Sequence, residues 1–577
     1  MAVSYRPEGG DHRELIRKAA RFPASRSVGA PPTRSLLTTA RRPSMRSAAS
    51  WSTDEKLAAA SPPPLPPVGV VAYNRMAFGP KPGDLELFAG LGGSDEARLL
   101  AFIDQQLAPE SIDDSVAEAR VAASGFTTLA KSLPELWVDH AVGDPDWEVR
   151  IRPVVETQLA TFIRAVYSRR QLVQVLADFW HNHFNVYGWD FWEAPVFVHY
   201  DRDVIRPNLL GNFRTMLGAV AKSTDMLFYL DNWLSSKDGP NENFARELLE
   251  LHTLGAENYF GAIPRDQVPT DGNGIAVGFV DEDVFSVARA LTGWSIDGDP
   301  WWDPTTGNGA YLYRHDWHDL SSKNVLGATL PASQPAEKDG QDVLDLLAAH
   351  PGTGKHIARK LCRRLIGDHP PEGVVNAAAA VFTAQASAPD QIAQVVRTIL
   401  LSNEFRSTWG EKVKRPFEIA VSSLRAGGAD FPFIEGDSDT ETFEWLYYNT
   451  GQYLFGWHPP NGYPDFKDAW ISSGPRVMGW RLTNWLIDVT DPVDAYRMDA
   501  VSQTPSQVRS AREIVEFWVD RILGRPVTQE TYDELIDFMA QGHNPEFDLP
   551  LDTDVDTQTR LQTLLGLIFM TPEFLWR

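Results

Sequence analysis

Apolar residues recur at intervals of three and four along most of the chain beyond residue 68, which is the period of helices with one buried face. Alternation with a period of two, typical of strands, is scarce. The sequence therefore predicts a mainly α-helical fold, a large and irregular multi-helix architecture with long loops rich in Trp and Gly. Helices are expected over residues 96–107, 154–178, 241–254, 282–292, 340–349, 353–366, 373–384, 390–401, 414–425, 511–523 and 557–570.

Three segments interrupt this helical pattern. Residues 1–68 are basic and Pro-rich without a sustained apolar period, so we expect a disordered tail. Residues 255–281 and 297–331 are rich in Gly, Pro, Asn and Asp and are longer than simple connections, as functional loops often are. We expect residues 69–577 to form a single large helical domain, with a subdivision near residue 335 as the alternative.

Composition narrows the class of protein. The net charge of −24 over 577 residues argues against a nucleic-acid partner, because phosphate binding requires clustered Lys and Arg. No apolar run reaches the roughly 18 residues that a membrane span needs. The tail lacks the apolar core of a secretory signal, which favours a cytoplasmic location. The only cysteine, Cys362, excludes an internal disulfide and is expected to be a structural thiol.

The nineteen tryptophans gather in clusters near residues 180–192, 294–317 and 445–485. Each supplies a large apolar area and a single N–H donor. We expect them mainly to pack the core, and a platform that stacks against sugar rings is the alternative.

Residues 241–255 combine an Asn start, a leucine face, several acids, a histidine and a Gly stop in one helix-sized unit. On helical geometry Asn243, Glu247 and Glu250 share one edge, whereas His252 points about 140° away from Glu247 and is expected to pack. Glu247 is predicted to be a ligand or a base, or else a buried hydrogen-bond acceptor, with Asn243 and Glu250 orienting it.

Two further motifs carry histidines. If the helix continues through residues 178–186, His181 shares a polar edge with Asn185, and His183 points into an aromatic face. His181 is then the better site candidate. In the second long loop, His315 and Asp316 could bind Zn, Mn or Fe, although a surface turn would use the same residue types.

Several segments together resemble the bacterial family named domain of unknown function 1800, from about residue 72 to the end. The matching segments are residues 75–80, 179–186, 241–255, 288–294, 315–316 with Lys323, 357–361, 414–418, 451–452 with 462–465, and 570–574. The resemblance implies no assigned activity, but it implies export and a sulfatase-like partner protein. The chain departs from the family pattern in its tail and in an insertion at residues 262–279.

We therefore expect an enzyme that acts on a polar substrate by hydrolytic or oxidative chemistry. Its catalytic residues would be His181, Glu247 and Asp316, and a divalent metal cofactor would be held by His181, Glu247 and His315. Asn185, Asn243 and Glu250 would orient these groups beneath the loop between Trp294 and Trp317. The alternative is a non-catalytic scaffold or a protein that binds a glycan or a partner, in which the polar motifs are structural.

Overall fold

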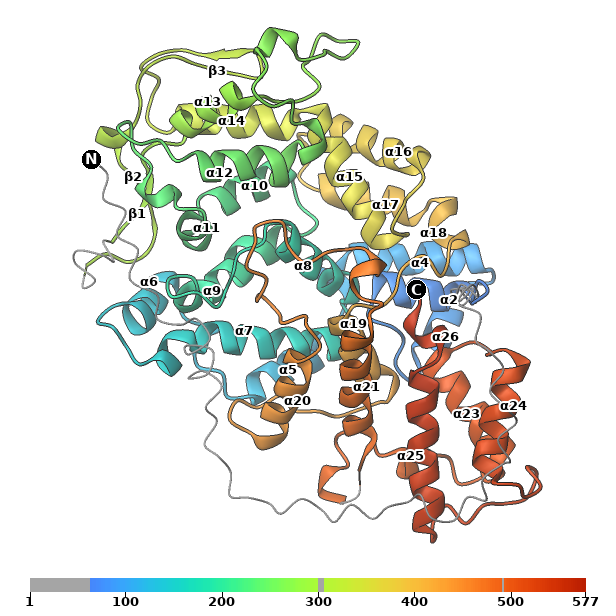
Figure 1. Ribbon diagram of the computed structural model, residues 1–577. Helices are drawn as coiled ribbons and strands as arrows, with labels where there is room; N and C mark the ends of the chain where they lie inside the picture. The colour runs from blue at the N-terminus through green and yellow to red at the C-terminus, as the bar shows by residue number, and fades with distance from the viewer. Residues whose placement is uncertain (1–62, 299–305, 490–491) are drawn as a thin grey trace, which may run out of the picture. The chain divides into compact units, whose positions relative to one another are not determined.

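Amphipathic helices account for most of the chain, which confirms the mainly helical prediction. The computed structural model describes residues 63–298, 306–489 and 492–577 (Figure 1). The tail predicted for residues 1–68 lies outside the described residues as far as residue 62, and α2 starts at Val68.

The helices, in chain order, are α2 (Val68–Met76), α3 (Asp84–Ala89), α4 (Asp95–Leu107), α5 (Ser115–Ala123), α6 (Leu133–Leu136), α7 (Trp147–Tyr167), α8 (Gln171–His183), α9 (Phe197–His199), α10 (Phe213–Ala221), α11 (Thr224–Tyr229), α12 (Glu242–Glu247), α13 (Asp281–Ala290), α14 (Lys338–Ala349), α15 (Pro351–Leu365), α16 (Glu372–Ala384), α17 (Gln391–Leu400), α18 (Asn403–Ser407), α19 (Pro416–Ala426), α20 (Ser438–Tyr448), α21 (Ser473–Ile487), α22 (Ala500–Gln503), α23 (Ala511–Leu523), α24 (Gln529–Ala540), α25 (Val555–Phe569) and α26 (Pro572–Leu575).

Short turns of other helical types join these elements. The π-helical turns are η2 (Trp137–Ala141), η4 (Tyr200–Ile205) and η7 (Leu248–Thr253). The 3₁₀ turns are η1 (Pro109–Ser111), η3 (Ala194–Val196), η5 (Arg206–Asn208), η6 (Asn232–Leu234), η8 (Ala256–Asn258), η9 (Arg265–Gln267), η10 (His315–Trp317), η11 (Lys467–Ala469) and η12 (Pro492–Asp494).

The single helix predicted over residues 154–178 is wrong, because two helices, α7 and α8, occupy this stretch and meet at Ser168. The carboxylate of Asp114 accepts hydrogen bonds from the Ser168 hydroxyl and from the backbone N–H of Arg169. The Gln171 side chain then donates to the carbonyl of Ala165 and so closes the end of α7. A contact with a residue more than fifty positions earlier in the chain therefore sets the break.

The helix predicted over residues 241–254 is present as α12 followed directly by the π-turn η7. Asn241 is the N-cap, and its side-chain oxygen accepts hydrogen bonds from the backbone N–H groups of Asn243 and Phe244. The segment ends at Gly255, whose φ of +96° suits glycine. Cap and stop residues thus limit the element as the sequence suggests.

The described part of the long loop at 297–331 and the three residues before it contain strands that periodicity does not reveal. Strands β1 (Trp294–Ile296) and β2 (Tyr311–Tyr313) form one antiparallel pair, in which Ser295 faces Leu312. Strands β3 (Lys323–Val325) and β4 (Ala328–Leu330) form a second antiparallel pair, in which Asn324 faces Thr329. With three residues in each strand, alternation is too short to detect from the sequence.

The described residues from 63 onward form one compact unit by their contacts, and a continuous set of buried apolar side chains runs from Val70 to Leu575. Helices α15, α16 and α17 pack in succession, and α23, α24 and α25 form another group of three near the C-terminal end (Figure 1). The last residues pair with the strand-like segment before α19 through a backbone bridge between Trp576 and Val413. Cys362 is buried in α15, as expected for a structural thiol. Across the described ranges, no helix combines the length and the apolar character that crossing a bilayer requires.

Candidate functional site

His181 lies near the C-terminal end of α8 and is held by a carboxylate of η4. Its Nε2 is 2.8 Å from Oδ1 of Asp201, and its side chain is only 10% exposed. Arg206 donates from Nε to the other oxygen of Asp201, at 2.7 Å. Burial alone would raise the pKa of Asp201, but the charge of Arg206 and the hydrogen bond with His181 hold it below its usual value. The rings of Phe197 and Phe455 cover the imidazole. His181 is therefore engaged within the protein.

The two asparagines that follow His181 fix a distant loop. Asn182 donates from Nδ2 to the carbonyl of Tyr463, and its side-chain oxygen accepts the backbone N–H of Tyr463. Asn185 donates to the carbonyls of Trp457 and Pro459, both at 2.9 Å. Asn185, predicted to orient a site, thus anchors the loop of residues 453–465 to α8.

His183 stacks in the aromatic face predicted for it, parallel to the ring of Phe179 and edge-on to Trp180. Its Nε2 lies 3.2 Å from the carbonyl of His252, which is itself 1% exposed. Both histidines are packing residues, as the helical geometry of the two motifs predicts.

Glu247 is half-buried at the C-terminal end of α12. Burial and then the nearby Glu250 raise its pKa, against the opposing charge of Arg246. Glu250 thus lies close enough to Glu247 to act on its charge, as the shared helical edge predicts. Asn243 is exposed one turn earlier, and its backbone N–H serves the N-cap. The negative charge of Glu247 also contributes to the raised pKa of Tyr229, for which burial is the largest cause.

His315 and Asp316 lie exposed in η10. The buried hydrogen bonds of this loop are made by His318 and Lys323, which follow in the sequence. His318 contacts the carbonyl of Thr292 through Nδ1 and Asp339 through Nε2, at 2.8 and 3.1 Å. The same oxygen of Asp339 accepts a hydrogen bond from Nζ of Lys323 at 2.5 Å.

The predicted metal ligands occupy three different environments: His181 beside Asp201, Glu247 on the half-buried edge of α12, and His315 at the surface. Within residues 63–298, 306–489 and 492–577, no group of three or more His, Cys, Asp or Glu side chains is placed to hold a metal ion. In the described chain, His181, Glu247 and His315 therefore do not form a set of ligands for the divalent metal that the sequence predicted.

A buried ionic cluster, absent from the site prediction, joins α8, α15, α19 and the C-terminus. Arg364 contacts Asp178 and Glu418 at 3.1 and 2.6 Å, Arg577 contacts Glu418 at 3.0 Å, and Arg415 pairs with Asp178. Burial alone would raise the pKa of Glu418, but the three guanidinium groups hold it well below its usual range. Two buried carboxylates thus contact three buried guanidinium groups, and this pairing offsets part of the cost of burying their charges.

An exposed aromatic face is the other feature that the sequence prediction did not resolve. We define it as Trp445 and Tyr448, which are exposed, together with the partly buried Tyr187, Trp189 and Tyr453. Trp445 and Tyr448 lie one turn apart on α20 and are 47% and 49% exposed. The ring of Tyr448 meets Tyr453 at 5.1 Å, and Tyr453 stacks on Trp189 at 4.7 Å.

Polar groups border the aromatic face. Burial, and after it the charges of Asp190 and Tyr448, raise the pKa of Tyr187. Asp190 is exposed. Behind the rings, burial raises the pKa of Glu444 to about 8, and Gln158 donates a hydrogen bond to this carboxyl group. Dispersed Tyr and Trp residues were visible in the sequence, but only the fold shows which of them share a surface.

Comparison with curated proteins and with solved structures found no match. Comparison with protein families did, and it confirms the resemblance drawn from the motifs. Residues 71–576 match the family described as "Protein of unknown function (DUF1800)", and the chain therefore belongs to that family.

Proposed function

We propose that the protein is a non-catalytic binding protein and that its ligand is an uncharged glycan, recognised at the aromatic face. The observation that carries this proposal is the exposure of two residues of the face: Trp445 is 47% and Tyr448 49% exposed, with the guanidinium of Arg481 lying 5.3 Å from the centre of the Trp445 ring. Contiguous apolar surface exposed in this way marks binding sites more often than chance. The face thus has unused binding capacity.

The chemistry of the face suits a sugar. Aromatic rings present flat apolar surfaces, and the C–H faces of pyranose rings are flat and apolar too. Sugar hydroxyls need hydrogen-bond partners at the edge of such a platform, and the hydroxyls of Tyr187 and Tyr448 and the carboxylate of Asp190 offer them. The net charge of −24 disfavours a polyanionic ligand, so we propose a neutral polysaccharide.

The polar motifs support binding better than catalysis by a His/Glu/Asp site. His181 is occupied by Asp201 and Asn185 by two carbonyls, and His315 is exposed. Groups engaged in this way act as struts between segments, whereas a catalytic group needs free access to its substrate. The sulfatase-like partner protein implied by the family resemblance stays a prediction.

The test is retention of the full chain in affinity gel electrophoresis with neutral polysaccharides such as xylan, glucan and mannan. Tyr448→Ala should weaken retention about tenfold, the effect of losing one stacking ring worth about 1.4 kcal/mol. Tyr448→Phe keeps the ring and should retain most of the binding. Phe547→Ala removes a ring that is 66% exposed on another surface and serves as the control.

Two results would overturn the proposal. One is an absence of retention on every neutral polysaccharide tested. The other is an equal loss of retention in Tyr448→Ala and Phe547→Ala, which would show that the aromatic face has no special part. Release of reducing sugar from a retained polysaccharide would contradict the non-catalytic assignment alone.

A further inference from the structure

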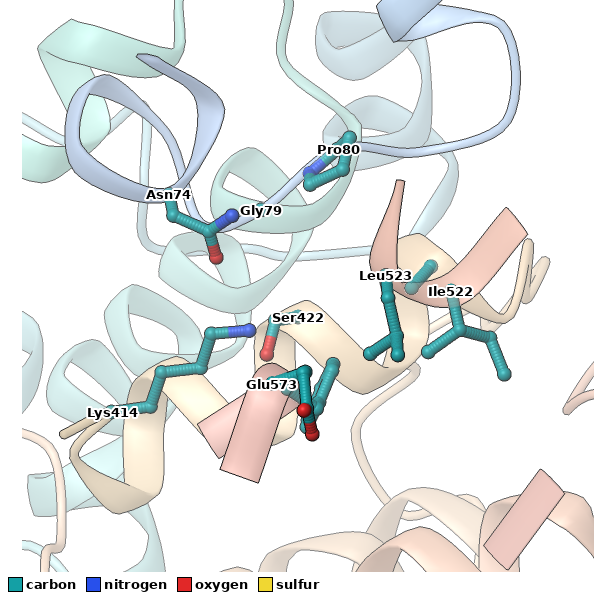
Figure 2. A pocket seen from close by; sticks show the side chains of 10 residues that line it. Asn74, Gly79, Pro80, Lys414, Ser422, Ile522, Leu523 and Glu573 are labelled. Carbon is teal, nitrogen blue, oxygen red and sulfur yellow. The ribbon is translucent and has the colours of Figure 1, made fainter. Parts of the chain in front are cut away.

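A small cavity lies between the end of α2, the start of α19 and the C-terminal helix α26 (Figure 2). Its lining includes Asn74, Gly79, Lys414, Ser422, Glu573 and Phe574. At roughly 10 Å³ it has room for about one water molecule, and it is partly open to solvent. Three segments that carry the family resemblance, residues 75–80, 414–418 and 570–574, meet here.

Lys414 is the charged group of interest in this cavity. Its backbone N–H donates to the carbonyl of Leu575 at 2.9 Å, which fixes the residue against the C-terminal segment. The residue is 4% exposed, and Nζ lies 3.8 Å from the centre of the Phe574 ring. In the part of the chain that the structure describes, the ammonium group makes no ion pair and Nζ donates no hydrogen bond, and Nζ keeps some contact with solvent. This contrasts with Lys412 and Lys323, which are paired with carboxylates.

The surroundings of Lys414 favour the neutral amine. Burial is the largest cause and lowers the pKa of Lys414 to about 7, the charge of Glu418 opposes the change, and the charge of Arg577 adds to it. A neutral amine is a nucleophile, whereas an ammonium ion is not. The lowered pKa leaves more of the Lys414 amine unprotonated at neutral pH than in an exposed lysine.

Gly79 leaves space in front of the amine. A Cβ atom at this position would lie 3.9 Å from Nζ of Lys414, 3.8 Å from Oδ1 of Asn74 and 3.4 Å from Cβ of Ser422. The φ of +88° at Gly79 also disfavours any side chain there. Figure 2 shows the side chain of Lys414 extending toward this space from below Asn74. The amine thus faces a gap that only a very small molecule can enter.

We propose that Lys414 is a modification site at which carbon dioxide adds to the amine to form a carbamate. The nitrogen lone pair attacks the carbon of CO₂, one C=O π bond opens, and the new C–N bond gives N–COO⁻. The nitrogen then loses one proton to solvent water, which the partly open cavity admits. No oxidant or reductant is needed.

Carbon dioxide suits an amine beside a small cavity that is partly open to solvent. It is small and uncharged, so it can enter a buried cavity without the cost of desolvating an ion. The product is an anion, which the charge of the Arg577 guanidinium favours and the charge of the Glu418 carboxylate opposes. Arg577 is held nearby because it donates from Nη1 to the carbonyl of Asn74.

The experiment equilibrates the full chain with carbon-13-labelled bicarbonate at pH 7.5, traps carbamates with a trialkyloxonium reagent, and maps the modified peptides by mass spectrometry. The expected result is a trapped carboxyl group on Lys414 and its complete loss in Lys414→Met. Methionine matches the apolar length of lysine and removes a buried amine, so the variant should fold.

Lys360→Met is the matched control. Burial also lowers the pKa of Lys360, to about 8, but Lys360 does not line this cavity. The carbamate on Lys414 should persist unchanged in that variant. Absence of trapped carbamate on Lys414 in the unmodified sequence overturns the proposal, including the case in which Lys360 alone is labelled. Because this result is read from the unmodified sequence, it does not depend on how either variant folds.

Discussion

Acidification should destabilise the protein through its buried histidines, and His252 allows the effect to be worked out. Its imidazole is 1% exposed, and its Nε2 has no hydrogen-bond partner among the described residues. The ring of His183 lies 6.2 Å away, and His356 and Lys360 are close enough to act on its charge. Burial, followed by the charges of Lys360 and His356, lowers the pKa of His252 to about 3.

The sign follows from the two states. In the unfolded chain the pKa of His252 returns to about 6.5, so below that pH the unfolded state binds a proton that the folded state rejects. The free energy of unfolding therefore falls by up to about 1.4 kcal/mol per pH unit between roughly pH 6.5 and pH 3. Between pH 7 and pH 5 the contribution of His252 amounts to about 2 kcal/mol. Asp225 and Glu193 act in the opposite direction, because burial raises the pKa of both.

A difference between variants isolates the histidine from these opposing groups. Urea denaturation, followed by tryptophan fluorescence at pH 7, 6 and 5, gives the free energy of unfolding for the natural sequence and for His252→Gln. The natural sequence should lose about 2 kcal/mol more than the variant over this interval. His315→Gln is the control, because it removes an imidazole that meets water in both states. Parallel curves for the natural sequence and His252→Gln would refute the reasoning, whatever their vertical offset.

Three further substitutions test the packing. Gly462→Ala should lower the free energy of unfolding, measured by urea denaturation, by more than about 2 kcal/mol. The new Cβ would lie 2.1 Å from the carbonyl oxygen of Asn182, at a residue whose φ is +72°. Gly373→Ala is the control and should not have this effect, because the space around Gly373 is open. Glu418→Gln should lower the free energy of unfolding by about 3–5 kcal/mol in the same assay, because it leaves the buried guanidinium groups of Arg364 and Arg577 without their carboxylate partner. Asp225→Asn should raise the melting temperature at pH 8, because the buried carboxyl must take up a proton on folding, and the gain should shrink toward pH 4; an equal gain at both pH values would contradict this.

Periodicity predicts the elements whose boundaries are set locally. The interval 511–523 matches α23, whose start is fixed by the capping box of Ser510 and Glu513. The prediction fails where a distant residue decides. The break between α7 and α8 depends on Asp114, and no property of the residues near Ser168 reveals that contact. Helix α21 also escapes prediction, since its Gly, Pro and Trp residues blur the apolar stripe.

The prediction of site residues likewise succeeds where local geometry decides and fails where a distant residue decides. Helical geometry correctly separates His183 from His181 and His252 from Glu247, because the angle between side chains on one helix is a local property. The loop of residues 314–319 has no such regularity. His315 and Asp316 are exposed there, whereas His318 turns inward to meet Asp339 on another element. Which histidine of an irregular loop is buried depends on partners that spacing does not show.

The polar density of the family motifs has a structural explanation that also indicates where function should be sought. Asn182 matches one backbone N–H and one carbonyl of Tyr463, and Glu418 joins several guanidinium groups, so each connects segments hundreds of residues apart or at opposite ends of the fold. Removing such a residue leaves its buried partner unpaired and lowers the free energy of unfolding. The protein can then lose its function although the residue is not catalytic. Dense polar sequence therefore cannot by itself distinguish a junction from a site. Side chains that keep an exposed ring, or a polar group unpaired among the described residues, are the better indication of a site. The half-exposed ring of Tyr448 and the amine of Lys414 are of this kind, whereas the paired residues already make their contacts within the fold.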